Sequence, residues 1–239
     1  MGQIEMFPEH WVPAIQASFL ARLPRQTQKA LLQDAREADA PPRGVLYSES
    51  ASPEHAHLVL IIDGLIRVFR TSRSGREVTV RQARQGDVLG LPSILAGATP
   101  GAAHAMVASK IVMMSARRLR TLAQNDSQLA WAVAEETAGS LFNIQERLVH
   151  NVLAPVRSRV ARYLIDVAVG SNATYVAVAR HEDIATAIGS VREVVARVLT
   201  EFRREGLASR SSSGILLVDM TALRQIAQTE EFQDFRTRP

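Results

Sequence analysis

The sequence predicts an α+β protein in which an antiparallel β-domain comes first, a long helix follows and a winged helix-turn-helix comes last. Three observations support this order. Short β-type runs separated by turns fill residues 44–115, a helical pattern continues from about residue 116 to 151, and residues 180–218 combine two short helices, a glycine turn and a hairpin. With 46% apolar and 22% charged residues, the 239-residue chain has the composition of a protein with a sizeable core.

The N-terminal region begins with a helical pattern from Pro13 to Ala38, which Pro41-Pro42 ends. Strands are then expected at residues 45–47, 57–69, 77–81, 87–91, 105–107 and 111–114. Ser74-Gly75 predicts one hairpin. Asp63-Gly64 predicts a second, between residues 58–62 and 65–69, because Asp-Gly suits the positive φ of a tight turn. Strands this short and regular predict a small antiparallel barrel or sandwich.

The long helix is predicted from Ala116 to Asn151, with a break near Asn125-Asp126. Its apolar stripe consists of Leu129, Val133, Leu141, Ile144, Leu148 and Val152. One barrel is too small to cover so long a rod, so we expect this helix to pair with its twin in a homodimer. The alternative is a helix that packs on its own barrel. Pro155 is suited to open the next helix, which places a hinge at Leu153-Ala154 and carries that helix to about Val169.

The stretch from Arg180 to Gly214 has helix-turn-helix spacing. A first short helix directs Ile184, Ala185 and Ile188 inward, and Gly189 permits a sharp turn. A second helix then buries Val195, Val198, Leu199 and Phe202. Residues 207–218 predict a β-hairpin wing, and residues 175–178 one more short strand.

Three polar residues of the second helix face away from its apolar side: Arg192, Glu193 and Arg197. They lie near the helix N-terminus, where such a helix meets base edges in the major groove. Arginine can donate two hydrogen bonds to guanine, and glutamate can accept one from cytosine. Arg180, Ser190 and Arg210 are the expected phosphate contacts. The alternative is a solvated face with a Glu193 to Arg197 pair, but it does not explain the turn, the apolar pattern and the wing together.

Composition limits the other kinds of chemistry. The chain has no cysteine, which excludes disulfides, thiolate-bound zinc and cysteine-held iron–sulfur clusters. Lys29 and Lys110 are the only lysines among 28 basic residues, and arginine suits planar recognition of phosphates and bases. We find no signal peptide pattern and no apolar run long enough for a bilayer, so we expect a cytoplasmic protein without a membrane partner. No catalytic signature stands out, and an enzyme is not expected.

The chain resembles the CRP/FNR family of bacterial transcription regulators along almost its whole length. The residues that carry the resemblance are IIDGLIRVFR, SGREVTVRQARQGDVLGLPSIL, VRSRVARYL and HEDIATAIGSVREVVARVLTEFRREGL. It implies an effector-sensing β-roll at residues 1–124, like the jelly roll of cyclic-nucleotide-binding domains. A dimerisation helix and hinge at 125–153 and a winged helix-turn-helix DNA-binding domain at 154–239 would follow.

The resemblance also implies a target and partners. Arg192 and Arg197 would take guanines and Glu193 a cytosine in a TGTGA-like half-site of a two-fold symmetric operator. Double-stranded DNA, RNA polymerase, a second copy of the chain and a small-molecule effector are the expected partners. The chain departs from the family pattern at two caps, because Val191, with Ser190 before it, and Arg180 stand where the family usually has Ser or Thr.

The effector is not expected to be cAMP. Gly86-Asp87 keeps the opening of the family's nucleotide cassette, but residues 96–109 contain no Arg or Lys to take a phosphate. A small apolar or aromatic molecule suits the remaining lining better. The candidate effector pocket consists of Leu89, Leu91, His104, Met106, Thr137, Ser140 and Ile144. The same composition would also suit an ordinary filled core.

Two alternatives stay open. The first is a haem-based sensor of carbon monoxide or nitric oxide within the same family, with His104 or His55 as the axial ligand. No other metal site is expected. The second is a regulatory module that acts on a protein partner and uses its helix-turn-helix only for contact.

Overall fold

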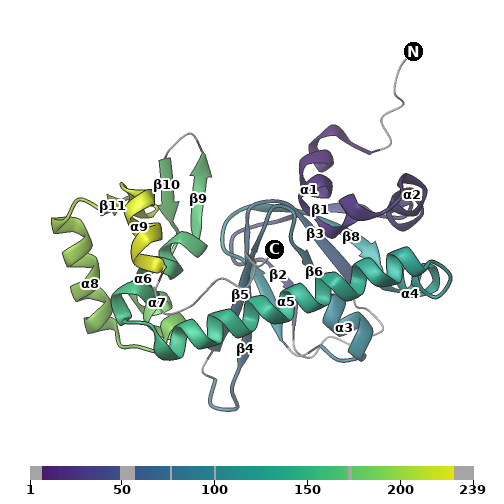
Figure 1. Ribbon diagram of the computed structural model, residues 1–239. Helices are drawn as coiled ribbons and strands as arrows, with labels where there is room; N and C mark the ends of the chain where they lie inside the picture. The colour runs from purple at the N-terminus through teal and green to yellow at the C-terminus, as the bar shows by residue number, and fades with distance from the viewer. Residues whose placement is uncertain (1–6, 49–56, 76, 100, 172–173, 229–239) are drawn as a thin grey trace, which may run out of the picture. The chain divides into compact units, whose positions relative to one another are not determined.

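A computed structural model describes residues 7–48, 57–75, 77–99, 101–171 and 174–228 (Figure 1). The chain forms two compact units, Met1–Ile144 and Gln145–Pro239, which are described separately below. In the described part of the chain, no helix is both long and apolar enough to cross a membrane.

The first unit begins with short helices: η1 (Glu9–Trp11), α1 (Val12–Ala17), η2 (Phe19–Arg22) and α2 (Arg25–Leu32). Pro24 stands at the N-cap of α2. The helix predicted as far as Ala38 is wrong at its end, because Arg36–Ala40 is a strand, β1. This strand pairs antiparallel with β8 (Ser109–Ser115), with Arg36 opposite Met113. Its hydrogen bonds to a distant strand override the local helical pattern.

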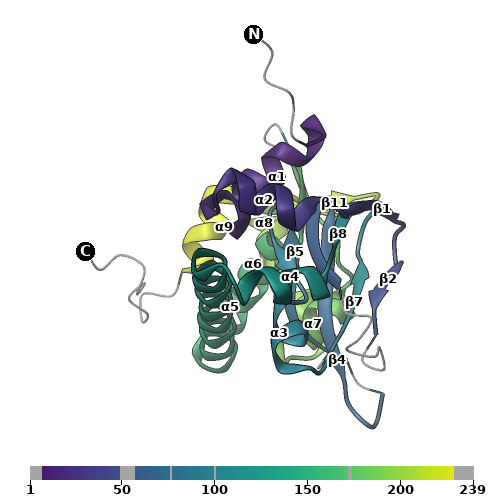
Figure 2. The same cartoon turned by 90° about the vertical axis from the view of Figure 1, so that its right-hand side faces the viewer.

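Two four-stranded antiparallel sheets make up the β-roll (Figure 2). The remaining strands are β2 (Val45–Tyr47), β3 (His57–Asp63), β4 (Leu65–Thr71), β5 (Glu77–Arg84), β6 (Val88–Leu89) and β7 (Ala102–Ala105). The first sheet has the order β1-β8-β3-β6 and the second has the order β2-β7-β4-β5. The strand predicted at 87–91 is shorter than expected, because Leu91 instead starts a helix, α3 (Leu91–Ala96). The strand predicted at 105–107 lies earlier in the chain, at 102–105.

The hairpin predicted at Asp63-Gly64 is wrong. β3 pairs with β8 and β6, whereas β4 pairs with β5 and β7, so the turn carries the chain from one sheet to the other. Gly64 has a φ of +102°, and a Cβ atom there would lie 2.1 Å from the Ser109 hydroxyl oxygen. Both facts require glycine. The hairpin predicted at Ser74-Gly75 is confirmed, because β4 and β5 pair on either side of it.

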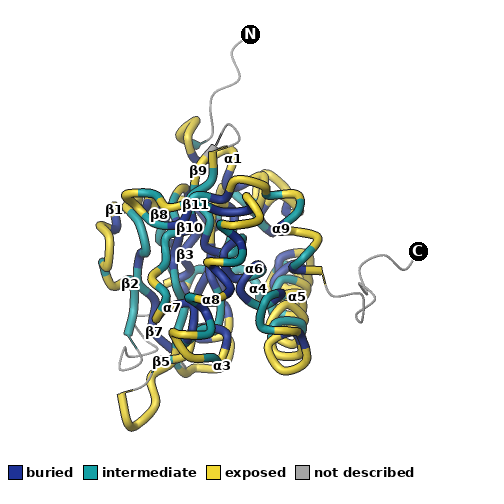
Figure 3. The backbone as a smooth tube through the Cα atoms, turned by 90° about the vertical axis from the view of Figure 1, so that its left-hand side faces the viewer, coloured by how far each residue is buried: buried dark blue, intermediate teal, exposed yellow. Residues whose placement is uncertain are grey.

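Strand β3 is buried on both faces. Leu58, Leu60 and Ile62 belong to a core shared with the surrounding helices, while Val59 and Ile61 belong to the core between the two sheets. Figure 3 draws the strand in the dark blue of buried residues. The first sheet is therefore the middle layer of this unit, with helices on one face and the second sheet on the other.

The long helix has the predicted break. α4 (Ala116–Ala123) ends shortly before α5 (Ser127–Leu153) begins. The Asp126 carboxylate accepts hydrogen bonds from the N–H groups of Gln128 and Leu129 at 3.0 and 3.1 Å. A hydrogen bond from Thr27 at 2.8 Å, together with these two, lowers the pKa of Asp126. Asp126 thus satisfies the free N–H groups that a helix start exposes.

The second unit contains α6 (Val156–Asp166), β9 (Ala168–Ser171), β10 (Thr174–Ala177), α7 (His181–Ile188), α8 (Arg192–Arg204), β11 (Ala208–Ser211), β12 (Gly214–Leu217) and α9 (Met220–Ala227). α6 begins directly after Pro155, as predicted. It ends before Val169, its predicted end, because residues 168–171 pair with β10. The four strands form one sheet of order β11-β12-β10-β9. Leu164, Ile184, Leu199 and Phe202 are fully or almost fully buried among the helices.

We predict that Gly64→Ala destabilises the first unit by about 3 kcal/mol or more, since it combines backbone strain with a steric clash. Gly75→Ala is the matched control: Gly75 also has a positive φ, of +79°, but its Cβ would meet nothing within 4 Å. It should cost only about 1 kcal/mol. Urea unfolding followed by fluorescence measures both, because Trp11 and Trp131, the two tryptophans, lie in this unit. Equal losses of stability would contradict the prediction.

Candidate functional site

The second unit holds the helix-turn-helix that the sequence predicts. α7 and α8 bury the expected apolar residues, and Gly189 between them has a φ of +64°. The N–H of Ser190 donates to the carbonyl oxygen of Ala185 at 2.9 Å, which closes the end of α7. A Cβ at Gly189 would meet nothing, so the positive φ alone accounts for glycine here.

Arg192, Glu193 and Arg197 lie exposed on the first two turns of α8. Arg192 forms an ion pair with Glu182 of α7 at 3.1 Å. The two side chains are 63% and 65% exposed, so water competes with this pair and it holds Arg192 only weakly. The Glu193 to Arg197 pair of the solvated-face alternative is not among the ion pairs of the described residues. All three side chains are therefore available to a partner.

The starts of the two helices differ. At α7, the Asp183 carboxylate accepts a hydrogen bond from the N–H of Arg180 at 3.0 Å, which is one half of a capping box. At α8, Val191 occupies the N-cap and no side chain caps the helix. The first N–H groups of α8 consequently remain open to an acceptor from outside the helix.

A pocket of about 380 Å³ lies beside the wing, the hairpin of β11 and β12. Arg180, His181, Arg203 and Arg210 line it, together with Ala179, Ser211, Gly214 and Ile215. Two of the three predicted phosphate contacts, Arg180 and Arg210, thus meet in one place, whereas Ser190 does not line the pocket. His181 and Arg203 were not predicted. In the sequence Arg203 resembles an ordinary basic residue in the last turn of a helix, and only the fold brings it to the wing.

The pocket is electropositive. The Arg203 Nε atom is buried and has no hydrogen-bond partner. Burial lowers the pKa of His181, and the positive charges of Arg203, Arg192 and Arg210 lower it further, against a smaller opposing effect of Glu182. His181 is therefore neutral near pH 7, and the charge of the pocket comes from its arginines. Such a site is suited to an anion that accepts several hydrogen bonds.

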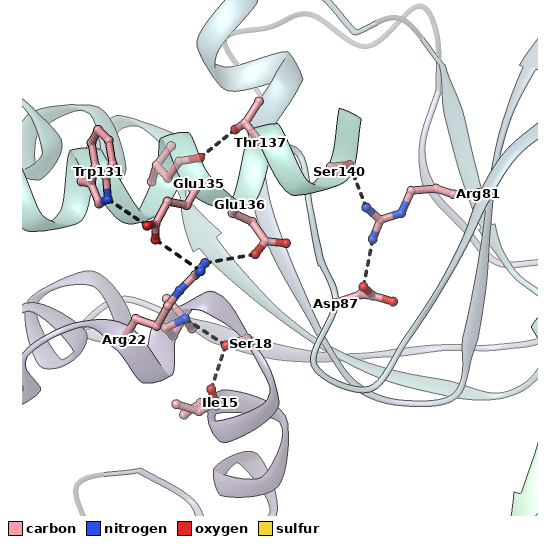
Figure 4. Close-up of polar contacts among 12 residues, drawn as sticks. Ile15, Ser18, Arg22, Arg81, Asp87, Trp131, Glu135, Glu136, Thr137 and Ser140 are labelled. Atoms are coloured by element: carbon pink, nitrogen blue, oxygen red, sulfur yellow. Dashed lines mark hydrogen bonds and ion pairs between the residues drawn. The ribbon is translucent and has the colours of Figure 1, made fainter. Parts of the chain in front are cut away.

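In the first unit, Ser140 is the member of the candidate effector pocket that contacts polar groups of the β-roll. Ser140 of α5 accepts a hydrogen bond from Arg81 of β5 at 3.2 Å, and Arg81 also forms an ion pair with Asp87 at 3.1 Å (Figure 4). The sequence prediction did not include Arg81, because the family's nucleotide cassette has its cation after the opening glycine turn, whereas Arg81 precedes Gly86-Asp87. Thr137 directs its hydroxyl into its own helix, donating to the Val133 carbonyl at 2.8 Å.

The other candidate pocket residues are dispersed. Leu89 belongs to the core between the sheets, whereas Leu91 packs with the helices. His104 alternates with the buried Ala103 and Ala105 and lies on the opposite face of β7. Its ring is 5.1 Å from that of Phe69.

The remaining members are Met106, which is half-buried, and Ile144, which is 37% exposed. His55, the other candidate haem ligand, lies outside the described residues. Over the part of the chain that is described, no group of three or more His, Asp or Glu side chains is placed to hold a metal ion.

Helix α5 presents a further surface. Leu129 and Val133, at its start, are buried in the first unit. The later apolar residues Leu141, Phe142, Leu148 and Val152 are each more than half exposed, and yellow marks much of this helix in Figure 3. An apolar surface of this kind on a helix usually marks a contact with a partner.

Two family models match the chain: the cyclic nucleotide-binding domain at residues 39–126 and the Crp-like helix-turn-helix domain at residues 158–226. The transcriptional regulator LdrP of Thermus thermophilus is 31% identical over 171 residues, which cover 69% of this chain and 84% of that protein.

Solved structures agree on the fold. FixK2 from Bradyrhizobium japonicum matches with a TM-score of 0.71 and 20% identity, covering 82% of this chain and 98% of that one. A CRP-family transcriptional regulator from Thermus thermophilus matches with a TM-score of 0.66 and 26% identity, covering 80% and 96%. With its β-roll, long helix and helix-turn-helix, the chain belongs to the CRP/FNR family of transcription regulators and is not an enzyme.

Proposed function

We propose that this regulator binds a palindromic promoter site as a homodimer and that a small apolar or aromatic effector controls its binding. The observation that carries the proposal is the exposed group Arg192, Glu193 and Arg197 at the start of an α8 that lacks a side-chain cap. Because DNA is its target, we place its action in the cytoplasm, with RNA polymerase as a further partner.

Base recognition is assigned to α8. Arg192 and Arg197 each donate two hydrogen bonds to a guanine, and Glu193 accepts one from a cytosine. The pair with Glu182 is weak because both side chains are exposed, so Arg192 loses little when it exchanges this pair for a base.

Phosphate recognition is assigned to the groups around α8. The open N–H groups at its start donate hydrogen bonds to one phosphate beside Ser190. The arginine pocket at the wing takes another through Arg180 and Arg210, and Arg203 adds a third positive charge there. These contacts fix the position of the domain on the duplex and carry no sequence information themselves.

Dimerisation is assigned to α5. Its exposed apolar residues continue the stripe that starts at Leu129 and Val133, and a second copy related by a two-fold axis would cover them. Two recognition helices would then be available for two half-sites about 34 Å apart.

Arg192→Ala should weaken operator binding by about 1–3 kcal/mol and remove the preference for one base at one position of each half-site. Fluorescence anisotropy with a set of single-base operator variants measures this. Arg204→Ala, at the far end of the same helix, is the control and should leave base preference unchanged. Equal weakening on every variant would instead make Arg192 a phosphate contact.

Arg210→Gln and Arg203→Gln should each weaken binding to all duplexes alike. Each replaces one phosphate contact, so the slope of log K against log salt should fall in size by about 1. Circular dichroism checks that the variants are folded. A changed base preference with an unchanged salt slope would contradict the assignment of this pocket to a phosphate.

Leu148→Asp should separate the dimer. A carboxylate buried without a partner costs about 3–5 kcal/mol, so the dissociation constant of the dimer should rise at least about 100-fold. Sedimentation velocity measures it. Val45→Asp is the matched control, because Val45 is also a largely exposed apolar residue, at 71% against 64% for Leu148, and lies on a strand of the β-roll. A Leu148→Asp variant that stays dimeric would exclude α5 as the interface.

A further inference from the structure

We infer that Arg81 is the group that recognises the effector, that the effector carries a carboxylate, and that Asp87 takes the place of this carboxylate when no effector is bound. The inference deepens the proposed function and rests on its effector-controlled switch, because it names the chemical class of the controlling molecule. Ser140 of α5 is the third member of the site (Figure 4).

The strand register places Arg81 on the inner face of the β-roll. Arg81 of β5 lies opposite Val68 of β4, Val68 lies opposite Ala103 of β7, and Ala103 lies opposite Tyr47 of β2. Residues opposite each other in antiparallel strands point to the same face of the sheet. Ala103 is fully buried in the core between the sheets, so Arg81 and Tyr47 are directed to that same side.

A cation in this position needs an anionic partner. The Arg81 side chain is only 17% exposed, and burying an unpaired guanidinium is costly. Its Nη2 atom lies 3.1 Å from a carboxylate oxygen of Asp87, and its Nη1 atom donates to the Ser140 hydroxyl at 3.2 Å. A guanidinium carries five N–H donors, more than these two contacts use.

Asp87 is the exchangeable member of this site. Its side chain is 36% exposed, twice as much as that of Arg81. Its other carboxylate oxygen accepts a hydrogen bond from the N–H of Arg84 at 2.8 Å, so Asp87 would keep a partner after leaving Arg81. A carboxylate from solution can therefore replace it without leaving a buried charge unpaired.

The surroundings favour a monocarboxylate with an apolar body. The planar fork of a guanidinium matches a carboxylate with two parallel hydrogen bonds, and one arginine balances one negative charge. Leu46, Val68 and Met113 are half-buried apolar side chains at the edge of the core beside Tyr47. Burial raises the pKa of the Tyr47 hydroxyl, and the positive charge of Arg81 opposes this effect, which indicates that the two groups are close.

Replacement of the Asp87 carboxylate by that of the effector would change a contact of the long helix, α5. In the structure, Arg81 connects the Gly86-Asp87 turn to Ser140 on α5. An effector on Arg81 would release that turn and alter the contact with α5. A molecule that binds one arrangement of this contact better than the other shifts the population of the two.

The test measures binding of acetate, benzoate and octanoate to the full-length protein by calorimetry, each beside its neutral amide. We expect at least one carboxylate to bind the wild type, and its amide to bind at least about tenfold more weakly. Asp87→Ala removes the internal competitor and should tighten carboxylate binding by about tenfold. Arg81→Gln should abolish the difference between acid and amide.

Two further variants keep the result interpretable. Arg67→Gln is the matched control: Arg67 is 16% exposed, lies one residue from Val68 on the other face of the sheet, and pairs with Glu77. It should leave carboxylate binding unchanged. Arg81→Lys keeps the charge without the planar fork and should bind carboxylates more weakly than the wild type does.

Three outcomes would overturn the inference. They are equal binding of acids and amides, carboxylate binding that survives Arg81→Gln, and binding to Asp87→Ala but not to the wild type, which would make Asp87 a permanent partner. The calorimetry is done without DNA and is therefore independent of the operator-binding experiments. A protein that binds carboxylates as expected but does not bind an operator selectively would count against the proposed function and not against this inference.

Discussion

The burial of strand β3 on both faces is the constraint on which the first unit depends. Leu58 and Leu60 must be covered by helices, and Val59 and Ile61 must be covered by a second sheet. A strand that is apolar on successive positions cannot leave either face in water. The turn at Gly64 then has to move the chain between the sheets instead of closing a hairpin. This layering brings β5 and α5 close enough for Arg81 and Ser140 to meet.

The second unit separates stability from recognition along a single helix. Val195, Leu199 and Phe202 on one side of α8 are buried with the rest of the unit, while Arg192, Glu193 and Arg197 on the other side contribute little to its core. Substitutions on the exposed side can therefore change which partner is bound without changing the fold. This division is typical of sites in which a rigid element positions polar groups for a partner.

Local signals account for what the sequence predicts correctly. The helix-turn-helix is encoded within about thirty residues by apolar spacing and Gly189, and the break before α5 by Asn125-Asp126, so local sequence is enough to predict both. β1 could not be predicted in this way, because its sequence, READA, becomes a strand only through pairing with β8.

The same limit applies to the candidate sites. The exposed residues of α8 follow from helical periodicity alone. Arg203 and Arg81 do not, because each is recognised as a site residue only from its neighbours in other elements. These neighbours are the wing for Arg203, and Asp87 and Ser140 for Arg81. A site built from residues that are far apart in the sequence can be identified only from the folded structure.

The missing cap of α8 has a consequence for the order in which this helix forms its hydrogen bonds. A first turn whose N–H groups have no acceptor frays more readily than the turns behind it, and this is the turn that carries Arg192 and Glu193. An anion docked against these amides would act as the absent cap and hold the turn in place. Part of the binding free energy would then go into ordering the first turn of this helix.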